Sequence, residues 1–139
     1  MSFRTDLGGT MTAMDVQTYN EQWQKAFANH DVEELLSLYS EDARVLAPGA
    51  PPMQGKRAFR EFANAMLEAG AKSCDLNSVD TIQAGDIIVD VGTYRMVIDP
   101  PGGGRVEDVG KYVDVLRRQP DGSLKIVVDT FNSDAPAPA

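Results

Sequence analysis

The sequence has little of the residue types that bind metals or form disulfides. It contains one cysteine, Cys74, and one histidine, His30, among 139 residues. A single cysteine excludes an internal disulfide, and one cysteine with one histidine is too few for the ligand sets that zinc sites usually need. We therefore expect no metal and no other cofactor.

The chain is also poor in positive charge and lacks long apolar runs. It has 13 Lys and Arg residues against 21 Asp and Glu residues, which gives a formal net charge of −8. This charge disfavours nucleic acid and anionic membrane surfaces as partners, because both repel an acidic protein. No apolar run approaches the ~20 residues that span a bilayer. Since the N-terminal residues also lack the apolar region of a secretory signal, we expect a cytoplasmic protein.

Apolar residues at helical spacing predict three helices in the N-terminal half of the chain. The first is expected to begin at an N-cap on Thr12, the second at Asp31, and the third near Lys56 with Gly70 just past its end. A short strand over residues 43–46 and a proline-rich loop over 48–52 separate the second helix from the third. The predicted buried face of the first helix consists of Val16, Tyr19, Trp23, Ala26 and Phe27.

After Gly70 the apolar pattern changes to alternation, which predicts an antiparallel sheet. Four strands are expected, over residues 72–82, 87–98, 106–118 and 124–132, with glycine and proline turns between them. Strands of about ten residues, against a usual five or six, require a sheet that curls. The sequence therefore predicts an α+β fold in which a cone-shaped, curved antiparallel sheet wraps around three N-terminal helices and encloses a pocket.

One domain is expected, over residues 14–134, and no internal repeat. The flanking residues 1–13 are predicted to be disordered or loosely ordered, and residues 135–139, which alternate alanine with proline, to form a disordered tail. The outer face of the predicted sheet carries apolar side chains that need cover, so we expect a homodimer through this face. These side chains are Val113, Val115, Ile126 and Val128.

Motifs along nearly the whole of residues 14–134 resemble those of the nuclear-transport-factor-2-like superfamily, in its ketosteroid-isomerase-like or SnoaL-like bacterial branch. They include the run from Leu38 to Ala43, the segments Gly92-Thr93-Tyr94 and Gly110-Lys111-Tyr112, and their order along the chain. The resemblance implies a cone-shaped α+β barrel with a ligand cavity, and a homodimer. It does not fix one activity, because this fold hosts isomerases, dehydratases, cyclases, epoxide hydrolases and non-enzymatic binding domains.

The resemblance can be followed to the residues that steroid isomerases use, which are a carboxylate base, a tyrosine donor and a protonated aspartic acid. The position of the base is Ala47 here, and the position of the donor tyrosine is Trp23. Asp114 matches the protonated aspartic acid, and Tyr39 matches a tyrosine behind the donor. The usual steroid-isomerase base is therefore missing from this chain.

Strand alternation places Asp114 and Asp129 on the cavity side of neighbouring strands. A carboxyl in an apolar pocket beside another carboxyl has a raised pKa and can act as a general acid or base. Alternatively, the two aspartates form hydrogen bonds to Trp23, Tyr39 or backbone amides and only satisfy a buried polar network. The candidate catalytic residues are Asp114 and Asp129, and the candidate ligand-binding residues are Trp23, Tyr39, Tyr94, Tyr112, Leu116 and Phe131.

Two functions follow from these candidates. The first is a cofactor-independent isomerase, dehydratase or cyclase of a small apolar molecule, with Asp114 as the acid or base. The second is a non-catalytic, dimeric small-molecule-binding or interaction domain of the same fold.

Overall fold

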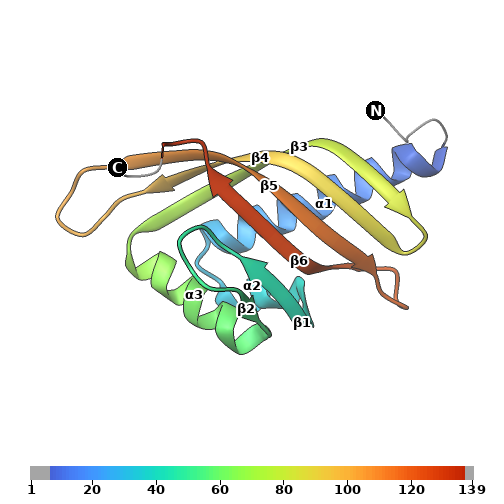
Figure 1. The fold of residues 1–139 in the computed structure, drawn as a ribbon, viewed down its shortest axis with the longest axis horizontal. Coiled ribbons are helices and arrows are strands. Elements are labelled where there is room, and N and C mark those ends of the chain that lie inside the picture. The colour runs from blue at the N-terminus through green and yellow to red at the C-terminus, as the bar shows by residue number, and fades with distance from the viewer. Residues whose placement is uncertain (1–6, 137–139) are drawn as a thin grey trace.

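The computed structural model describes residues 7–136, which contain three helices and a six-stranded sheet (Figure 1). In chain order the elements are α1 Leu7–Ala28, α2 Val32–Ser37, β1 Tyr39–Leu46, β2 Met53–Gln54, α3 Lys56–Glu68, β3 Ala71–Ala84, β4 Ile87–Ile98, β5 Val106–Arg118 and β6 Leu124–Ser133. No helix among these residues is long and apolar enough to cross a membrane.

The sheet has the strand order β2-β1-β6-β5-β4-β3. The strands from β3 to β6 form the predicted antiparallel meander, and β4 and β5 have the predicted limits. Strand β1 was not expected in its observed place: it lies beside β6 and runs parallel to it. The α+β class is confirmed, with a curved and mostly antiparallel sheet that does not close.

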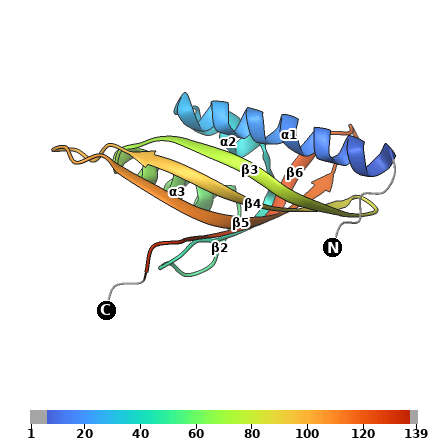
Figure 2. The ribbon, with the colours of Figure 1, turned by 90° about the horizontal axis from the view of Figure 1, so that it is seen from above.

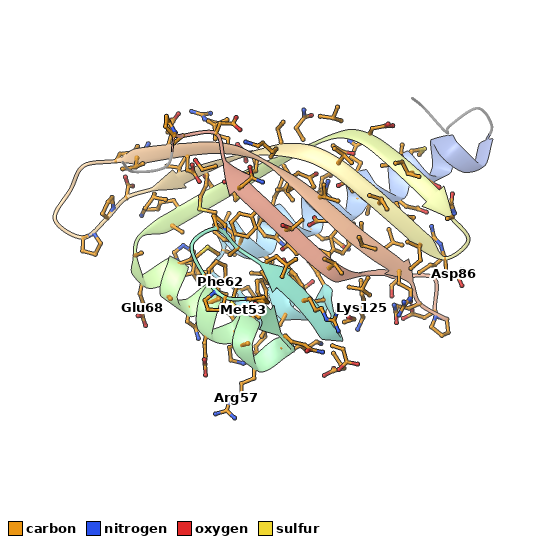
Figure 3. The ribbon with its side chains drawn as sticks, viewed as in Figure 1. Met53, Arg57, Phe62, Glu68, Asp86 and Lys125 are labelled. Carbon is orange, nitrogen blue, oxygen red and sulfur yellow. The ribbon has the colours of Figure 1, made fainter. Side chains whose placement is uncertain are left out.

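The helices cover one face of this sheet. Figure 2 shows α1 along the length of the sheet, and all five residues of its predicted apolar face are buried. In α3, Phe59 and Ala63 are buried, while Phe62 packs against the core from a partly exposed position. Figure 3 shows Phe62 toward the sheet and Arg57 away from it. Helical spacing therefore identified the buried faces correctly.

The first helix begins earlier than predicted. It starts at Leu7, so residues 7–13 of the expected loosely ordered segment are helical, and residues 1–6 lie outside the described residues. Thr12 is 3% exposed and donates a hydrogen bond from its hydroxyl to Gln83 of β3, so it is anchored within the helix. Of the expected tail 135–139, residues 137–139 also lie outside the described residues.

A β-bulge in β6 changes which residues of that strand face the core, so the predicted alternation is wrong for part of the strand. Val115 pairs with Val128, but the next residue, Leu116, pairs with Ile126, so Val127 is an extra residue in β6. An extra residue reverses the alternation on one side of it. Ile126 is therefore 1% exposed and lies in the core, and its predicted place on the outer face is wrong.

Candidate functional site

Three aspartates lie in one row across the buried face of the sheet. Asp90 of β4 pairs with Asp114 of β5, and Asp114 pairs with Asp129 of β6. Directly paired residues of antiparallel strands point to the same face. Their exposed fractions are 0%, 5% and 9%, so three carboxyl groups are buried side by side.

Asp129 is the acceptor at the end of a short hydrogen-bonded chain. The indole N–H of Trp23 donates to the hydroxyl of Tyr39 at 3.0 Å, and this hydroxyl donates to Oδ2 of Asp129 at 2.9 Å. By contrast, Oδ1 of Asp114 is buried with no hydrogen-bond partner among the described residues. A buried carboxyl oxygen without a donor is costly when the group is ionised.

The environment keeps a proton on this pair. Burial raises the pKa of Asp114 well above its ordinary value, and the charge of Asp129, a hydrogen bond to Asp129 and the charge of Asp90 raise it further. Burial also raises the pKa of Asp129, but the hydrogen bonds from Asp114 and Tyr39 oppose that rise. Tyr39 donates to Asp129 while Oδ1 of Asp114 has no donor, so the shared proton is favoured on Asp114 over Asp129.

Asp90, the third member of the row, was not among the residues predicted from sequence. Its Oδ2 accepts hydrogen bonds from Tyr112 Oη at 2.8 Å and Asn20 Nδ2 at 3.3 Å, and its Oδ1 accepts one from Ser78 Oγ at 2.5 Å. With three donors, this buried carboxylate is well satisfied. Asp90 thus holds Tyr112 in place beside the catalytic candidates.

Asp90 belongs to a short internal repeat that the sequence prediction missed. Residues 90–94 read Asp-Val-Gly-Thr-Tyr and residues 108–112 read Asp-Val-Gly-Lys-Tyr. In the paired strands β4 and β5, Gly92 lies opposite Tyr112 and Tyr94 opposite Gly110. Each glycine leaves room for the tyrosine ring across from it, since an added Cβ would stand 2.5 Å from the ring Cζ in both cases.

The tyrosine of each copy donates a hydrogen bond to the aspartate of the other copy, so the repeat forms two equivalent clusters. Tyr94 donates to Asp108 Oδ2 at 3.0 Å, as Tyr112 does to Asp90. Ser133, which pairs with Gly110, donates to Asp108 Oδ1 at 2.6 Å, just as Ser78, which pairs with Gly92, donates to Asp90. We call these groups the inner cluster (Ser78, Asp90, Tyr112) and the rim cluster (Ser133, Asp108, Tyr94).

The aspartate pair lines a partly open cavity between the sheet, α1 and α3. Its volume is about 50 Å³, and one water molecule needs about 10–15 Å³. Seven of the eight predicted site residues line the cavity; the exception is Leu116, which is 1% exposed and lies in the apolar core instead. The lining residues are Trp23, Tyr39, Phe59, Phe62, Met66, Cys74, Leu76, Tyr94, Met96, Tyr112, Asp114, Asp129 and Phe131.

The cavity wall has aromatic and sulfur-containing side chains but no lysine, arginine or histidine among the described residues. Sequence reasoning missed the part of the wall that comes from α3 and β3, including Phe59 and Cys74. The apolar face of α3 was predicted, but alternation alone could not show that it closes the cavity. Burial raises the pKa of the Cys74 thiol, so it remains protonated.

The positions that correspond to steroid-isomerase groups are arranged differently here. Ala47 lies outside the cavity lining and carries no carboxylate. The N–H of Trp23 is used by Tyr39, so it does not donate into the cavity. The groups left for chemistry are the two carboxyls of Asp114 and Asp129. Among the described residues, no three acidic, cysteine or histidine side chains are grouped to hold a metal ion.

The helices and the curved sheet define a cone-shaped α+β protein, and its cavity carries a pair of carboxyl groups in a mostly apolar wall. Residues 20–128 match the family model of the SnoaL-like domain, and the chain belongs to this family. The predicted resemblance is confirmed. Among curated proteins, none matches the chain in sequence.

Solved structures support the same fold. A ketosteroid isomerase-like protein from Erwinia carotovora atroseptica has a TM-score of 0.79 at 16% identity, over 96% of this chain and 100% of that chain. A conserved protein from Planctomyces limnophilus has a TM-score of 0.80 at 19% identity, over 89% of this chain and 98% of that chain. An NTF2-like protein with a cystatin-like fold from Novosphingobium aromaticivorans has a TM-score of 0.74 at 16% identity, over 96% and 94%. At these identities the likeness shows the fold alone.

Proposed function

We propose that the protein catalyses proton transfer on a small, mostly apolar molecule, without a cofactor, through Asp114 and Asp129. The observation that carries this proposal is the buried pair of carboxyls, both with a raised pKa, in the wall of an apolar cavity. A carboxyl whose pKa is raised by burial suits general acid and base catalysis.

The pair can move a proton without creating a buried double negative charge. The oxygen of Asp114 that does not bond to Asp129 takes a proton from a carbon of the substrate. In the same step the proton that Asp114 already carries passes from its other oxygen to Asp129, so the pair becomes neutral and the substrate becomes an anion. The reverse transfer to a second carbon completes an isomerisation and restores the pair. Tyr39 steadies Asp129 by its hydrogen bond throughout.

The test is an isomerisation with a simple probe. Purified protein is incubated with cyclohex-3-enone, and conversion to the conjugated cyclohex-2-enone is followed by ultraviolet absorbance. We expect Asp114→Asn to lower the rate by about a hundredfold or more, which is the usual contribution of such a group. Asp42→Asn, on an exposed position of β1, is the matched control and should keep the wild-type rate. A wild-type rate no higher than that of Asp114→Asn would refute the proposal for this class of substrate.

A second candidate function is a binding domain without catalysis. The small cavity favours it, because pockets for drug-sized ligands usually have about 300–1,000 Å³, against about 50 Å³ here. Native mass spectrometry of the purified protein distinguishes the two. A molecule that remains bound and unchanged in the wild-type protein, together with no turnover in the isomerisation test, would support the binding domain.

We also propose that the protein is a homodimer through the outer face of the sheet. Val91 and Val109 are 36% and 47% exposed on this face, and Val113, Val115 and Val128 are partly exposed beside them. An apolar sheet face of this kind favours cover by a second copy. In light scattering after size exclusion, Val91→Lys should give a monomer, whereas Val79→Lys on the edge strand should leave the dimer intact. A monomeric wild-type protein would contradict this arrangement.

A further inference from the structure

The three tyrosines in the cavity wall differ in how fully their hydroxyl groups are bonded. Tyr39 accepts a hydrogen bond from Trp23 and donates one to Asp129. Tyr112 donates to Asp90 and accepts from Asn20 at 3.4 Å. Tyr94 donates to Asp108, but no donor among the described residues bonds to its oxygen.

The rim cluster fixes the direction of the Tyr94 hydroxyl. A carboxylate only accepts hydrogen bonds, so Asp108 holds the phenolic hydrogen, and Ser133 secures Asp108 from the other side. Burial and the bond to Asp108 raise the pKa of Tyr94, which therefore stays a neutral phenol. The lone pairs of its oxygen remain free to accept a hydrogen bond.

The position of Tyr94 is also fixed. Its ring lies over Gly110 and meets Phe131 edge-on, with 6.0 Å between the ring centroids. Both Tyr94 and Phe131 line the cavity, and Tyr94 is only 5% exposed. The Tyr94 oxygen is thus held in place at the cavity wall and accepts no hydrogen bond from the described residues, so a ligand with a hydroxyl group can supply one.

We propose that Tyr94 determines specificity in this cavity by accepting a hydrogen bond from a hydroxyl group of the bound molecule. This inference rests on the proposed function, because it assumes that the cavity takes a small molecule. The ligand class is an uncharged, mostly apolar alcohol or phenol. A ketone or ether of the same shape has no hydrogen to donate and leaves the Tyr94 oxygen unpaired, which costs about two- to tenfold in affinity.

The test compares two probes with one carbon skeleton, 1-phenylethanol and acetophenone. Their dissociation constants are measured by NMR titration with the wild-type protein, Asp108→Asn and Tyr94→Phe. In Asp108→Asn the new amide N–H can donate to the Tyr94 oxygen, which frees the phenolic hydrogen for a ketone. We expect the preference for the alcohol over the ketone to fall by about threefold or more.

Tyr94→Phe checks the same idea by deletion. It should weaken binding of 1-phenylethanol by about threefold while leaving acetophenone nearly unchanged. The effect of Asp108→Asn should persist in the Asp114→Asn background, which separates Tyr94 from the carboxyl pair. Circular dichroism verifies that each variant is folded.

The outcomes separate this inference from the proposed function. If both probes bind and neither variant changes their ratio, Tyr94 does not select the hydroxyl, while the use of the cavity stands. If neither probe binds to the wild-type protein, both the inference and the proposed use of the cavity are wrong.

Discussion

The inner cluster and the rim cluster contain the same three residue types in the same relation, yet their surroundings differ. Helix α1 covers the inner cluster and supplies Asn20, which donates to both Asp90 and Tyr112. At the rim, Asp108 is only partly buried, and no such residue reaches Tyr94 among those described. The difference teaches that the same three residues can have two roles. Where a helix supplies the remaining hydrogen bond, as in the inner cluster, they support the structure, and where no helix does so, as at the rim, the tyrosine is left to bind a ligand.

Removing the two carboxylates should show this contrast most strongly. Asp90→Ala removes the acceptor of the buried Tyr112 hydroxyl and of Ser78, and one of the two acceptors of Asn20, so the free energy of unfolding should fall by about 3 kcal/mol or more. Asp108→Ala, at the partly exposed rim, should cost only about 1 kcal/mol. Urea unfolding measures both, and equal losses would show that the two clusters are equally structural.

Filling the space above the two glycines should have the next largest effect. Gly92→Ala and Gly110→Ala both push a methyl group into a tyrosine ring and a neighbouring backbone carbonyl, which costs about 1–3 kcal/mol. Gly92→Ala should cost more, because Tyr112 is held by two partners and Tyr94 by one. Thermal unfolding of the two variants decides the order, and the reverse order would count against the comparison.

The two clusters should also act differently on the pKa of Asp114. Asp90 is one of the charges that raise this pKa, whereas Asp108 is not. Asp90→Asn should therefore lower the pKa of Asp114, and Asp108→Asn should leave it unchanged, as measured by carbon-detected NMR titration of the carboxyl groups. A shift in Asp108→Asn as large as that in Asp90→Asn would contradict this.

The raised pKa of Asp114 has a defined effect on stability. The folded state binds the proton more tightly than the unfolded state, so the contribution is full below the unfolded value of ~3.9 and is lost as the pH rises through the folded pKa. Asp114→Asn removes this dependence and should stabilise the protein at neutral pH by about 1 kcal/mol. Urea unfolding of both proteins between pH 4 and pH 8 tests the sign, and parallel curves would refute it.

The two serines should give the smallest contrast. Ser78→Ala removes a 2.5 Å hydrogen bond to the fully buried Asp90, and we expect a loss of about 1 kcal/mol. Ser133→Ala removes a similar bond to the rim residue Asp108, and we expect about half of that loss. The same unfolding assay applies, with a larger loss for Ser133→Ala as the contradicting result.

Much of the fold could be read from the sequence because strong turn residues mark its limits. Proline and glycine between Ile98 and Val106 set the facing ends of β4 and β5, and Gly70, at φ 104°, ends α3 as predicted. The parallel pairing of β1 with β6 could not be read, since it depends on contacts between distant segments. The bulge at Val127 could not be located either, because Ile126, Val127 and Val128 are consecutive apolar residues and any of them could face the core.

The candidate site was predictable where alternation acts within one regular strand. Asp114 and Asp129 were placed together because each lies on a regular stretch, although the bulge shifts the residues before Asp129. Leu116 does lie on the inner face of β5, as predicted, but it is too far along the strand to reach the cavity. Asp90 was missed, although the repeat of Asp-Val-Gly-x-Tyr was visible in the sequence. Such a repeat indicates that the two segments have similar surroundings in neighbouring strands.

The parallel pairing of β1 with β6 has a consequence for how the molecule assembles. Tyr39 at the start of β1 meets Asp129 of β6, a contact between residues 90 positions apart. Contacts of such long range close late in folding, because the entropy of a large loop must be overcome first. During synthesis the acidic end of the cavity cannot form until β6 has left the ribosome. Asp129 and the tyrosine that steadies it are therefore brought together only after β6 has emerged.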